Sequence, residues 1–237
     1  MRQQKLSQKE KEMLLLRFWS NEKDQTVQLE EEKNIPQSHK KIMEHYFSEK
    51  QSSSFALKKI RVKIKGLDFD IYSAPGIFSK SKVDNGTRLL IEKAIVKGKV
   101  LDLGCGNGII GIALKKLNPE LNVFVSDVNE RAVEVSKMNS KGLDIIAVKS
   151  DGFDNLKEKF DTILLNPPQA AGKDLCFRLI KESCAYLNKN GLFELVARHN
   201  KGGKTYMKCM QEVFGNAKDI AKASGYRIYL SKKIVYT

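Results

Sequence analysis

Short apolar segments of strand character alternate with helical segments from Lys99 onward. The expected strands are Val100–Leu103, Val123–Ser126, Ile145–Val148, Thr162–Leu165 and Leu192–Ala197, and the expected helices are Ile109–Leu117, Glu130–Ser140, Asp174–Leu187 and Lys204–Phe214. Strands separated by helices indicate a parallel sheet covered on both faces. The last segments, Ala217–Ala223 and Tyr226–Ser231, favour an antiparallel hairpin around Ser224-Gly225. We therefore predict an α/β, Rossmann-like fold with a mostly parallel, seven-stranded sheet that ends in this hairpin.

The chain before Lys99 is organised differently. Residues 1–50 contain no glycine and are rich in Gln, Glu, Lys and Ser, so we expect an N-terminal arm that is helical or partly disordered. Residues 51–237 are expected to form the main domain. It would begin with a β-hairpin over about residues 57–73, with one lysine-bearing face, because apolar and polar residues alternate on both sides of Lys65-Gly66. A helix is expected from about Asp84 to Ala94.

Composition limits the classes of protein that fit. The chain has 237 residues, of which 41% are hydrophobic, so it is long enough for a substantial core. It contains no stretch of about 18 apolar residues and no signal-peptide pattern, so we expect a cytoplasmic protein. Four cysteines without a CxxC spacing and three unclustered histidines predict no metal site. The net charge of +14 favours a polyanion such as RNA as partner and opposes the binding of basic peptides.

A glycine-rich turn, Asp102-Leu-Gly-Cys-Gly-Asn-Gly108, follows the first expected strand and precedes a helix. Glycines at this place permit a tight turn and let a ligand approach the backbone. The spacing is G-x-G-x-G and not G-x-G-x-x-G, so a pyrophosphate is poorly matched. Asp102 would bring a carboxylate near a bound ammonium group.

Two further acids end the next two strands. Asp127 is expected to accept hydrogen bonds from ribose hydroxyls, or alternatively to cap the following helix with Glu130 three positions on. Asp151 would accept from an adenine amino group, or alternatively be a turn residue beside Gly152. Together with the glycine turn, these acids predict a site for a nucleoside that carries an ammonium group.

Asn166-Pro167-Pro168 ends the apolar run Phe160–Leu165. The Asn166 side chain and the Pro167 backbone each offer a carbonyl, and proline has no N–H that would compete for it. Two acceptors would hold both protons of an amine conjugated to a ring and aim its lone pair at a methyl donor, so catalysis would depend on positioning. The alternative is a proline-rich strand exit that only ends the crossover.

The chain from about His45 to Lys233 resembles the small-subunit ribosomal RNA guanine-N2 methyltransferase family, especially its short archaeal-type, single-domain members. The resemblance is carried by Tyr46-Phe47-Ser48-Glu49, Gly76-Ile77-Phe78-Ser79, Lys82-Val83-Asp84, Gly86-Thr87, Val100–Gly108, Asn166-Pro167-Pro168, Ala171-Gly172-Lys173 and Val213-Phe214-Gly215-Asn216. It implies a class I methyltransferase that uses S-adenosyl-L-methionine. Larger members have a second, degenerate domain before the catalytic one, and residues 1–50 are too short for it.

The resemblance also implies roles for individual residues. It puts Asp102, Gly104, Gly106, Asp127 and Asp151 in the donor pocket, with Phe78 and Asp84 near the methionine end. The complete predicted cofactor site is Phe78, Asp84, Asp102, Gly104, Cys105, Gly106, Asn107, Gly108, Asp127, Val128, Asp151, Gly152 and Asn166. The predicted catalytic residues are Asn166, Pro167 and Pro168, and the predicted substrate-binding residues are Gln169, Lys173 and Arg198.

Gln169 departs from the family pattern, because many amino methyltransferases have an aromatic residue there that stacks on the target base. Either another aromatic residue stacks (Phe78, Phe177 or Tyr46), or Gln169 hydrogen-bonds the base edge. The function expected is methylation of an exocyclic amine in RNA, most specifically guanine N2 in small-subunit ribosomal RNA. The alternatives are a protein glutamine N5 methyltransferase acting on a translation factor, and a non-catalytic RNA-binding module.

Overall fold

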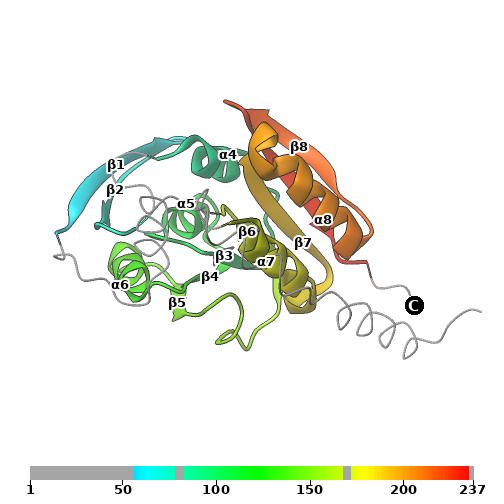
Figure 1. Cartoon of the computed structure of the whole chain (residues 1–237). Helices are drawn as coiled ribbons and strands as arrows, with labels where there is room; N and C mark the ends of the chain where they lie inside the picture. Colours follow the sequence, from blue (N-terminus) through cyan, green and yellow to red (C-terminus); the bar gives the residue numbers. More distant parts are fainter. Residues whose placement is uncertain (1–55, 78–82, 168–171, 235–237) are drawn as a thin grey trace, which may run out of the picture. The chain divides into compact units, whose positions relative to one another are not determined.

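A seven-stranded sheet organises the computed structural model, which describes residues 56–77, 83–167 and 172–234 (Figure 1). Its strands are β3 (Lys99–Leu103), β4 (Asn122–Asp127), β5 (Ile145–Lys149), β6 (Phe160–Leu165), β7 (Leu187–Arg198), β8 (Lys218–Ala223) and β9 (Tyr226–Lys232). In space they follow the order β5-β4-β3-β6-β7-β9-β8. The expected arm at residues 1–50 lies outside the described residues, and its separation from a main domain stays a prediction.

The pairing of the strands confirms the predicted fold class. β3 is parallel to β4 and β6, β4 is parallel to β5, and β6 is parallel to β7. β9 is antiparallel to both β7 and β8, which gives the expected antiparallel end of the sheet. The helices are α4 (Asn85–Lys93), α5 (Ile109–Leu117), α6 (Glu130–Asn139), α7 (Gly172–Tyr186) and α8 (Lys204–Phe214). A kinked turn, η2 (His199–Gly203), precedes α8, and Lys201 and Gly202 within it have non-helical backbone angles. None of the helices in the described ranges is long and apolar enough to span a membrane.

The predicted hairpin is present as a separate two-stranded sheet of β1 (Lys58–Ile64) and β2 (Leu67–Ser73). Lys65 and Gly66 between them have φ angles of 47° and 79°, as tight two-residue hairpin turns require. The outward face carries the expected basic side chains, but acids from β2 lie opposite them: Lys59 pairs with Asp70 at 2.7 Å. The charge of this face is therefore partly neutralised.

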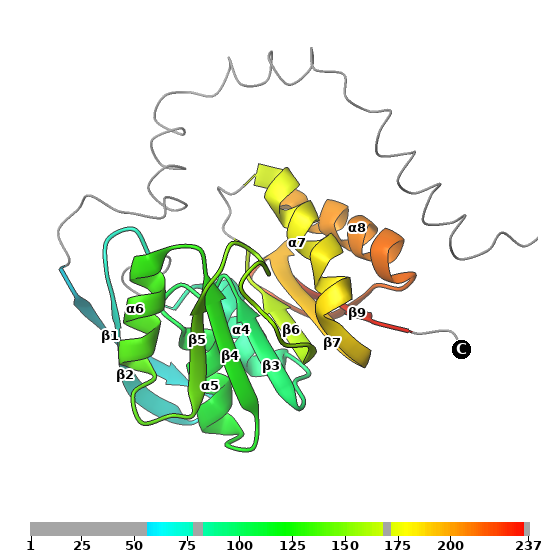
Figure 2. The same cartoon turned by 90° about the horizontal axis from the view of Figure 1, so that it is seen from below.

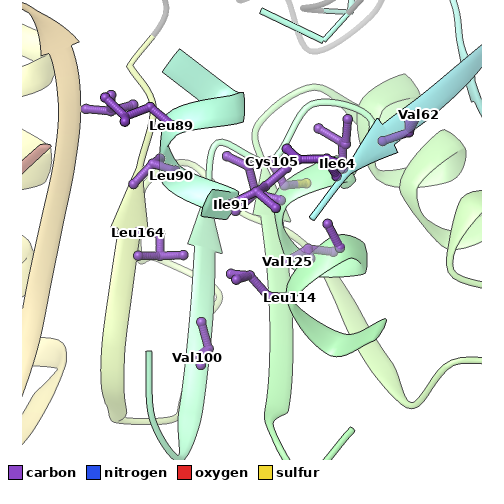
Figure 3. Packing of buried hydrophobic residues seen from close by; sticks show 14 of the residues in the cluster. Val62, Ile64, Leu89, Leu90, Ile91, Val100, Cys105, Leu114, Val125 and Leu164 are labelled. Atoms are coloured by element: carbon purple, nitrogen blue, oxygen red, sulfur yellow. The ribbon is translucent and has the colours of Figure 1, made fainter. Parts of the chain in front are cut away.

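Helices cover both faces of the large sheet (Figure 2). An apolar cluster lies against each face. Figure 3 shows the first, in which Leu89, Leu90 and Ile91 of α4 meet strand residues such as Val100 and Leu164. The hairpin and α5 contribute to the same cluster, with Val62 and Leu114 among their residues. The second cluster joins the opposite faces of the strands to α7 and α8. Burial on both faces explains the nearly continuous apolar strand sequences.

The end of α7 and the start of β7 differ from the prediction. β7 begins at Leu187, where a helix end was expected, and its first residue pairs with Phe160 of β6. The polar run Asn188–Gly191 resembles a loop in sequence, yet it is part of β7. Asn190 adopts a left-handed φ of 63° and its N–H donates to the Lys233 carbonyl at 3.0 Å. Long-range pairing therefore overrides the local turn preference of these residues.

The order of the strands creates a switch point beside β3. The chain runs outward from β3 through β4 to β5, and then returns to place β6 on the other side of β3. In open α/β sheets, ligands bind outside the carboxyl ends of the strands at such a point. The glycine turn follows β3, Asp127 ends β4 and Asn166 follows β6, so three of the predicted site segments meet there.

A buried carboxyl group ties the end of α4 to the sheet. Glu194 in β7 has no exposed surface, and its Oε1 accepts a hydrogen bond from the Ile95 N–H at 2.7 Å. Its Oε2 has no partner among the described residues. Burial raises the pKa of Glu194 to about 8.

We predict that Glu194→Gln alters how stability depends on pH. The unfolded carboxyl ionises near 4.5, whereas the folded pKa is about 8, so the wild-type protein loses stability as pH rises between these values and stays constant above them. Each unit of pKa difference corresponds to about 1.4 kcal/mol, so the loss amounts to several kcal/mol. The amide of Gln cannot ionise and still accepts from Ile95, so the variant should lack this decline.

Urea unfolding at several pH values from about 5 to 9 measures the effect. Glu134→Gln, on the exposed surface of α6, is the control and should leave the wild-type profile unchanged. Parallel profiles for Glu194→Gln and the wild type would contradict the prediction.

Candidate active site

The glycine-rich turn between β3 and α5 has the conformation that its sequence predicts. Gly104, Gly106 and Gly108 have φ angles of 69°, 57° and 79°, in the left-handed region that side chains disfavour. A Cβ atom on Gly104 would meet no atom within 4 Å, because this residue borders an open cavity. The turn therefore leaves room for a ligand to lie directly against its backbone.

Asp127 fixes the turn from the neighbouring strand. Its Oδ2 accepts from the Gly106 N–H and its Oδ1 accepts from the Asn129 N–H, both at 2.9 Å. Burial raises the pKa of Asp127, while these N–H donors act in the opposite direction. The N-cap of α6 is Asn129, whose side chain accepts from the Arg131 N–H at 3.0 Å, so the alternative of Asp127 as the cap is wrong.

Asp102 lies beneath the turn rather than on the cavity wall. Its carboxylate is 1% exposed and accepts from the Gly111 N–H of α5 at 3.1 Å. Burial raises the pKa of Asp102 to about 7, and the nearby charge of Asp127 adds to this shift. In this structure the side chain stabilises the junction of β3 and α5, and its expected contact with an ammonium group stays a prediction.

A single large cavity joins most of the predicted donor residues, with about 960 Å³ of space including the part open to solvent. Predicted residues on its wall are Gly104, Cys105, Gly106, Asn107, Asp127, Val128, Asp151, Gly152 and Asn166. Gly76, Ile77 and Thr87 also line it, and they belong to the motifs of the family resemblance but had no role assigned from the sequence. Sequence reasoning did not single out Asn129, Ala132, Leu175 and Leu179, which line it as well. Leu175 and Leu179 are spaced four residues apart on α7, a helical pattern that identifies one face of the helix but not the cavity that it borders.

The cavity fits an amino-acid-bearing nucleoside. Asn107 is 2% exposed and lines the cavity, and its Nδ2 has no hydrogen-bond partner among the described residues. A buried amide N–H₂ without a partner is costly, and a ligand carboxylate would satisfy it. Apolar residues such as Val128 and Leu179 supply a surface for a flat ring. The described residues contain no cluster of three or more His, Cys, Asp or Glu side chains that could hold a metal ion.

Asp151 reaches the cavity wall but has a charged partner. Its Oδ1 lies 2.5 Å from Nη2 of Arg178 on α7. Arg178 also lies 3.9 Å from Glu182, so this arginine is engaged by two acids. Asp151 therefore precedes the turn at Gly152 and also lines the cavity. Its contact with an adenine amino group stays a prediction.

Asn166 lies on the cavity wall at the end of β6, near the first turn of α4. Its Nδ2 donates to the Thr87 hydroxyl at 3.0 Å, and no described residue donates to its Oδ1. Pro167 follows in the chain and does not line the cavity. Asp84 caps α4 instead of lining the cavity, since its Oδ1 accepts from the Gly86 N–H at 2.9 Å. Phe78, Pro168 and Gln169 lie outside the described residues.

Three predicted site residues remain: Lys173 and Arg198 lie off the cavity wall, and Cys105 lies on it. Lys173 is in the first turn of α7, and Arg198 ends β7 with its guanidinium carbon 5.2 Å from the centre of the Tyr226 ring. Burial raises the pKa of the Cys105 thiol well above its usual range, so Cys105 is a packing residue and not a nucleophile. Neither basic residue touches the cavity, and any role in holding substrate stays a prediction.

Comparison with known proteins agrees with this geometry. Residues 68–230 match the family model described as the methyltransferase small domain. The match covers more than half of the chain and contains the glycine turn, Asp127 and Asn166. The chain therefore belongs to the methyltransferase small domain family. The prediction of a class I methyltransferase with S-adenosyl-L-methionine as its cofactor is confirmed.

Particular relatives give this family membership more detail. The chain is 36% identical over 201 residues to the uncharacterized protein YbxB of Bacillus subtilis strain 168, with 81% of this chain and 100% of that protein covered. It is 34% identical over 198 residues to ribosomal RNA small subunit methyltransferase C of Actinobacillus pleuropneumoniae serotype 7, with 79% of this chain but 59% of that protein covered. The chain thus spans little more than half the length of that relative.

A solved structure with a similar fold is the 16S rRNA N2 methyltransferase RsmC of T. thermophilus, in complex with AdoMet and guanosine. The TM-score is 0.68 at 24% identity, and the match covers 78% of this chain and 52% of that one. At this identity the likeness supports the fold alone.

We predict that Asp127→Ala weakens binding of S-adenosylmethionine by tenfold or more, or about 1.4 kcal/mol. The variant removes the acceptor that holds Gly106 and the carboxylate available to ribose hydroxyls. Titration calorimetry measures the dissociation constant. Asp144→Ala is the matched control, because the Asp144 side chain is 88% exposed and is not on the cavity wall. Unchanged affinity in Asp127→Ala would leave this residue a structural role alone.

Proposed function

We propose that this protein transfers a methyl group from S-adenosylmethionine to the exocyclic N2 of guanine in small-subunit ribosomal RNA. The observation that carries the proposal is the position of Asn166, at the cavity wall beside the donor residues with its Oδ1 free of any described donor. A carbonyl oxygen at this place can accept hydrogen bonds from a methyl-accepting substrate that carries N–H groups. An amine attached to a ring is such an acceptor.

The chemistry required of the protein is positioning. S-adenosylmethionine supplies a methyl group activated by a positively charged sulfur. The amine lone pair is delocalised into its ring, so the protein must orient the amine and localise that lone pair. Asn166 Oδ1 on the cavity wall would accept one amine proton. The second acceptor proposed from the sequence is the Pro167 backbone carbonyl, which comes next in the chain, and the two together would direct the lone pair toward the methyl group. No general base is needed, because water takes the surplus proton after transfer.

RNA as the substrate class is supported by charge and by relatives. The net charge of +14 attracts phosphates, and Lys173, Arg198, Lys201 and Lys204 lie at the carboxyl side of the sheet, where the cavity opens. Relatives at 34% identity are named ribosomal RNA small subunit methyltransferases, and the RsmC structure holds guanosine. A base inside a duplex must be flipped out to enter such a cavity, so unpaired guanines are the favoured targets.

The test is transfer of labelled methyl groups into three separate pools: unmodified ribosomal RNA with its small subunits, transfer RNA, and release-factor protein. Nucleoside analysis follows any label in RNA. We expect label in the ribosomal RNA pool as N2-methylguanosine. Label in a glutamine of the protein pool, or on another nucleoside, would overturn the proposal. Binding of RNA without donor binding would indicate a non-catalytic RNA-binding module.

We predict that Asn166→Ala lowers turnover by roughly 100-fold or more, because the amine loses an acceptor that orients it. The affinity for S-adenosylmethionine should stay within about twofold, since the glycine turn and Asp127 are untouched. Single-turnover kinetics and calorimetry measure the two quantities. The matched control is Asn122→Ala at the amino end of β4, where the side chain is exposed and far along the strand from the cavity. Near-normal turnover in Asn166→Ala would remove this residue from the acceptor site.

A further inference from the structure

Three polar side chains form a directed chain of hydrogen bonds between α4 and the end of β6. The Thr87 hydroxyl donates to Oδ2 of Asp84, and Asn166 Nδ2 donates to the same Thr87 oxygen at 3.0 Å. The other carboxylate oxygen of Asp84 accepts from the N–H groups of Gly86 and Thr87 at 2.9 and 3.1 Å. These contacts connect the first turn of α4 to Asn166, which comes 79 positions after Thr87 in the sequence.

The polarity of this chain follows from the groups themselves. A carboxylate has no proton to give, so the bond between Asp84 and Thr87 must use the hydroxyl proton of Thr87. The Thr87 oxygen then has only lone pairs left for Asn166, which must face it with the N–H₂ end of its amide. The amide oxygen therefore points away from Thr87. The assignment of the amide rests on this network of donors and acceptors, which leaves one consistent orientation.

We propose that Thr87 is a positioning residue that fixes the amide of Asn166 with its carbonyl toward the acceptor amine, and that Asp84 sets the polarity of Thr87. The proposal rests on the proposed function, in which Asn166 Oδ1 accepts a proton of the substrate amine. In the reversed orientation, Asn166 would present N–H₂ to the incoming N–H₂, and two donors would face each other. The hydrogen-bond chain excludes that arrangement.

The surroundings make the chain rigid. Thr87 is 2% exposed, so water does not compete for its hydroxyl. α4 is packed closely at its start, where a Cβ on Gly86 would lie 3.1 Å from the ring of Tyr226 in β9. At its far end, the Ile95 N–H donates to Glu194 in β7. The helix that holds Thr87 is therefore fixed to the sheet that holds Asn166.

Three substitutions separate positioning from structure. Thr87→Val keeps the shape but removes the hydroxyl, so Asn166 loses its partner. Thr87→Ser keeps the hydroxyl and should act as the wild type. Asp84→Asn retains a good N-cap. The oxygen of the new Asn side chain must still accept from the N–H groups of Gly86 and Thr87. Its N–H₂ group therefore faces the Thr87 hydroxyl oxygen and donates to it. The Thr87 proton then points at Asn166, whose amide must turn over and present its N–H₂ to the cavity.

We expect Thr87→Val to lower kcat roughly tenfold, the equivalent of one hydrogen bond, and Asp84→Asn to lower it further. Thr87→Ser should restore kcat, while the donor dissociation constant stays near the wild-type value in all three variants. Thr87→Val should also lower the thermal midpoint, because it leaves buried polar groups without a partner, whereas a helix that is merely destabilised would not rank Asp84→Asn below Thr87→Val in kcat. Values of kcat for both variants within about twofold of the wild type would overturn the proposal.

A second readout is independent of turnover. In the wild type, the Asn166 side-chain amide protons should exchange slowly with solvent by NMR, because one of them is bonded to the buried Thr87 oxygen. Exchange should become fast in Thr87→Val and in Asp84→Asn, and slow again in Thr87→Ser. Fast exchange in the wild type would overturn the proposal even if methyl transfer is observed. Slow exchange without methyl transfer to RNA would support the positioning role and refute the proposed substrate instead.

Discussion

The reversal of strand order at β3 is the constraint on which the site depends. Because β4 and β6 lie on opposite sides of β3 and all three run in the same direction, their carboxyl ends meet at one edge. The glycine turn, Asp127 and Asn166 each follow one of these strands. Residues from three distant parts of the sequence are thus brought to one cavity by topology alone. The hydrogen bond from the Gly106 N–H to Asp127 then links two of these strand ends directly.

Much of the fold could be predicted because its determinants are local. The bounds of α5 and α8 agree with the sequence prediction, since glycine residues mark the start or end of each helix. The hairpin could be predicted from its alternation and from Lys65-Gly66. The start of β7 could not, because Asn188–Gly191 has the composition of a loop and is held by pairing with residues far away in sequence. The arrangement of strands, not local preference, decided that element.

The site was predicted less completely, for a physical reason. Sequence shows which residues end a strand, but in a sheet buried on both faces it does not show which face a side chain occupies. Asp102 and Asn166 share the face of the sheet that carries Val100 and Leu164, yet Asp102 lies against α5 under the turn, whereas Asn166 meets α4 and reaches the cavity wall. Thr87 and Leu179 line the same cavity from helices whose packing is decided by tertiary contacts. No pattern around Thr87 indicates its partner 79 residues away.

The hairpin shows that a sequence family and a folding unit need not coincide. The family match begins at residue 68, inside β2, so β1 lies before it. Yet β1 pairs with β2 along its whole length, and its residues Ile60, Val62 and Ile64 are buried in the cluster that also contains α4. A shortened protein that starts at the family boundary would lack β1. It would leave β2 with an unpaired edge and expose one side of α4, the helix that contains Thr87. The smallest autonomous version of this enzyme therefore has to begin before Lys58.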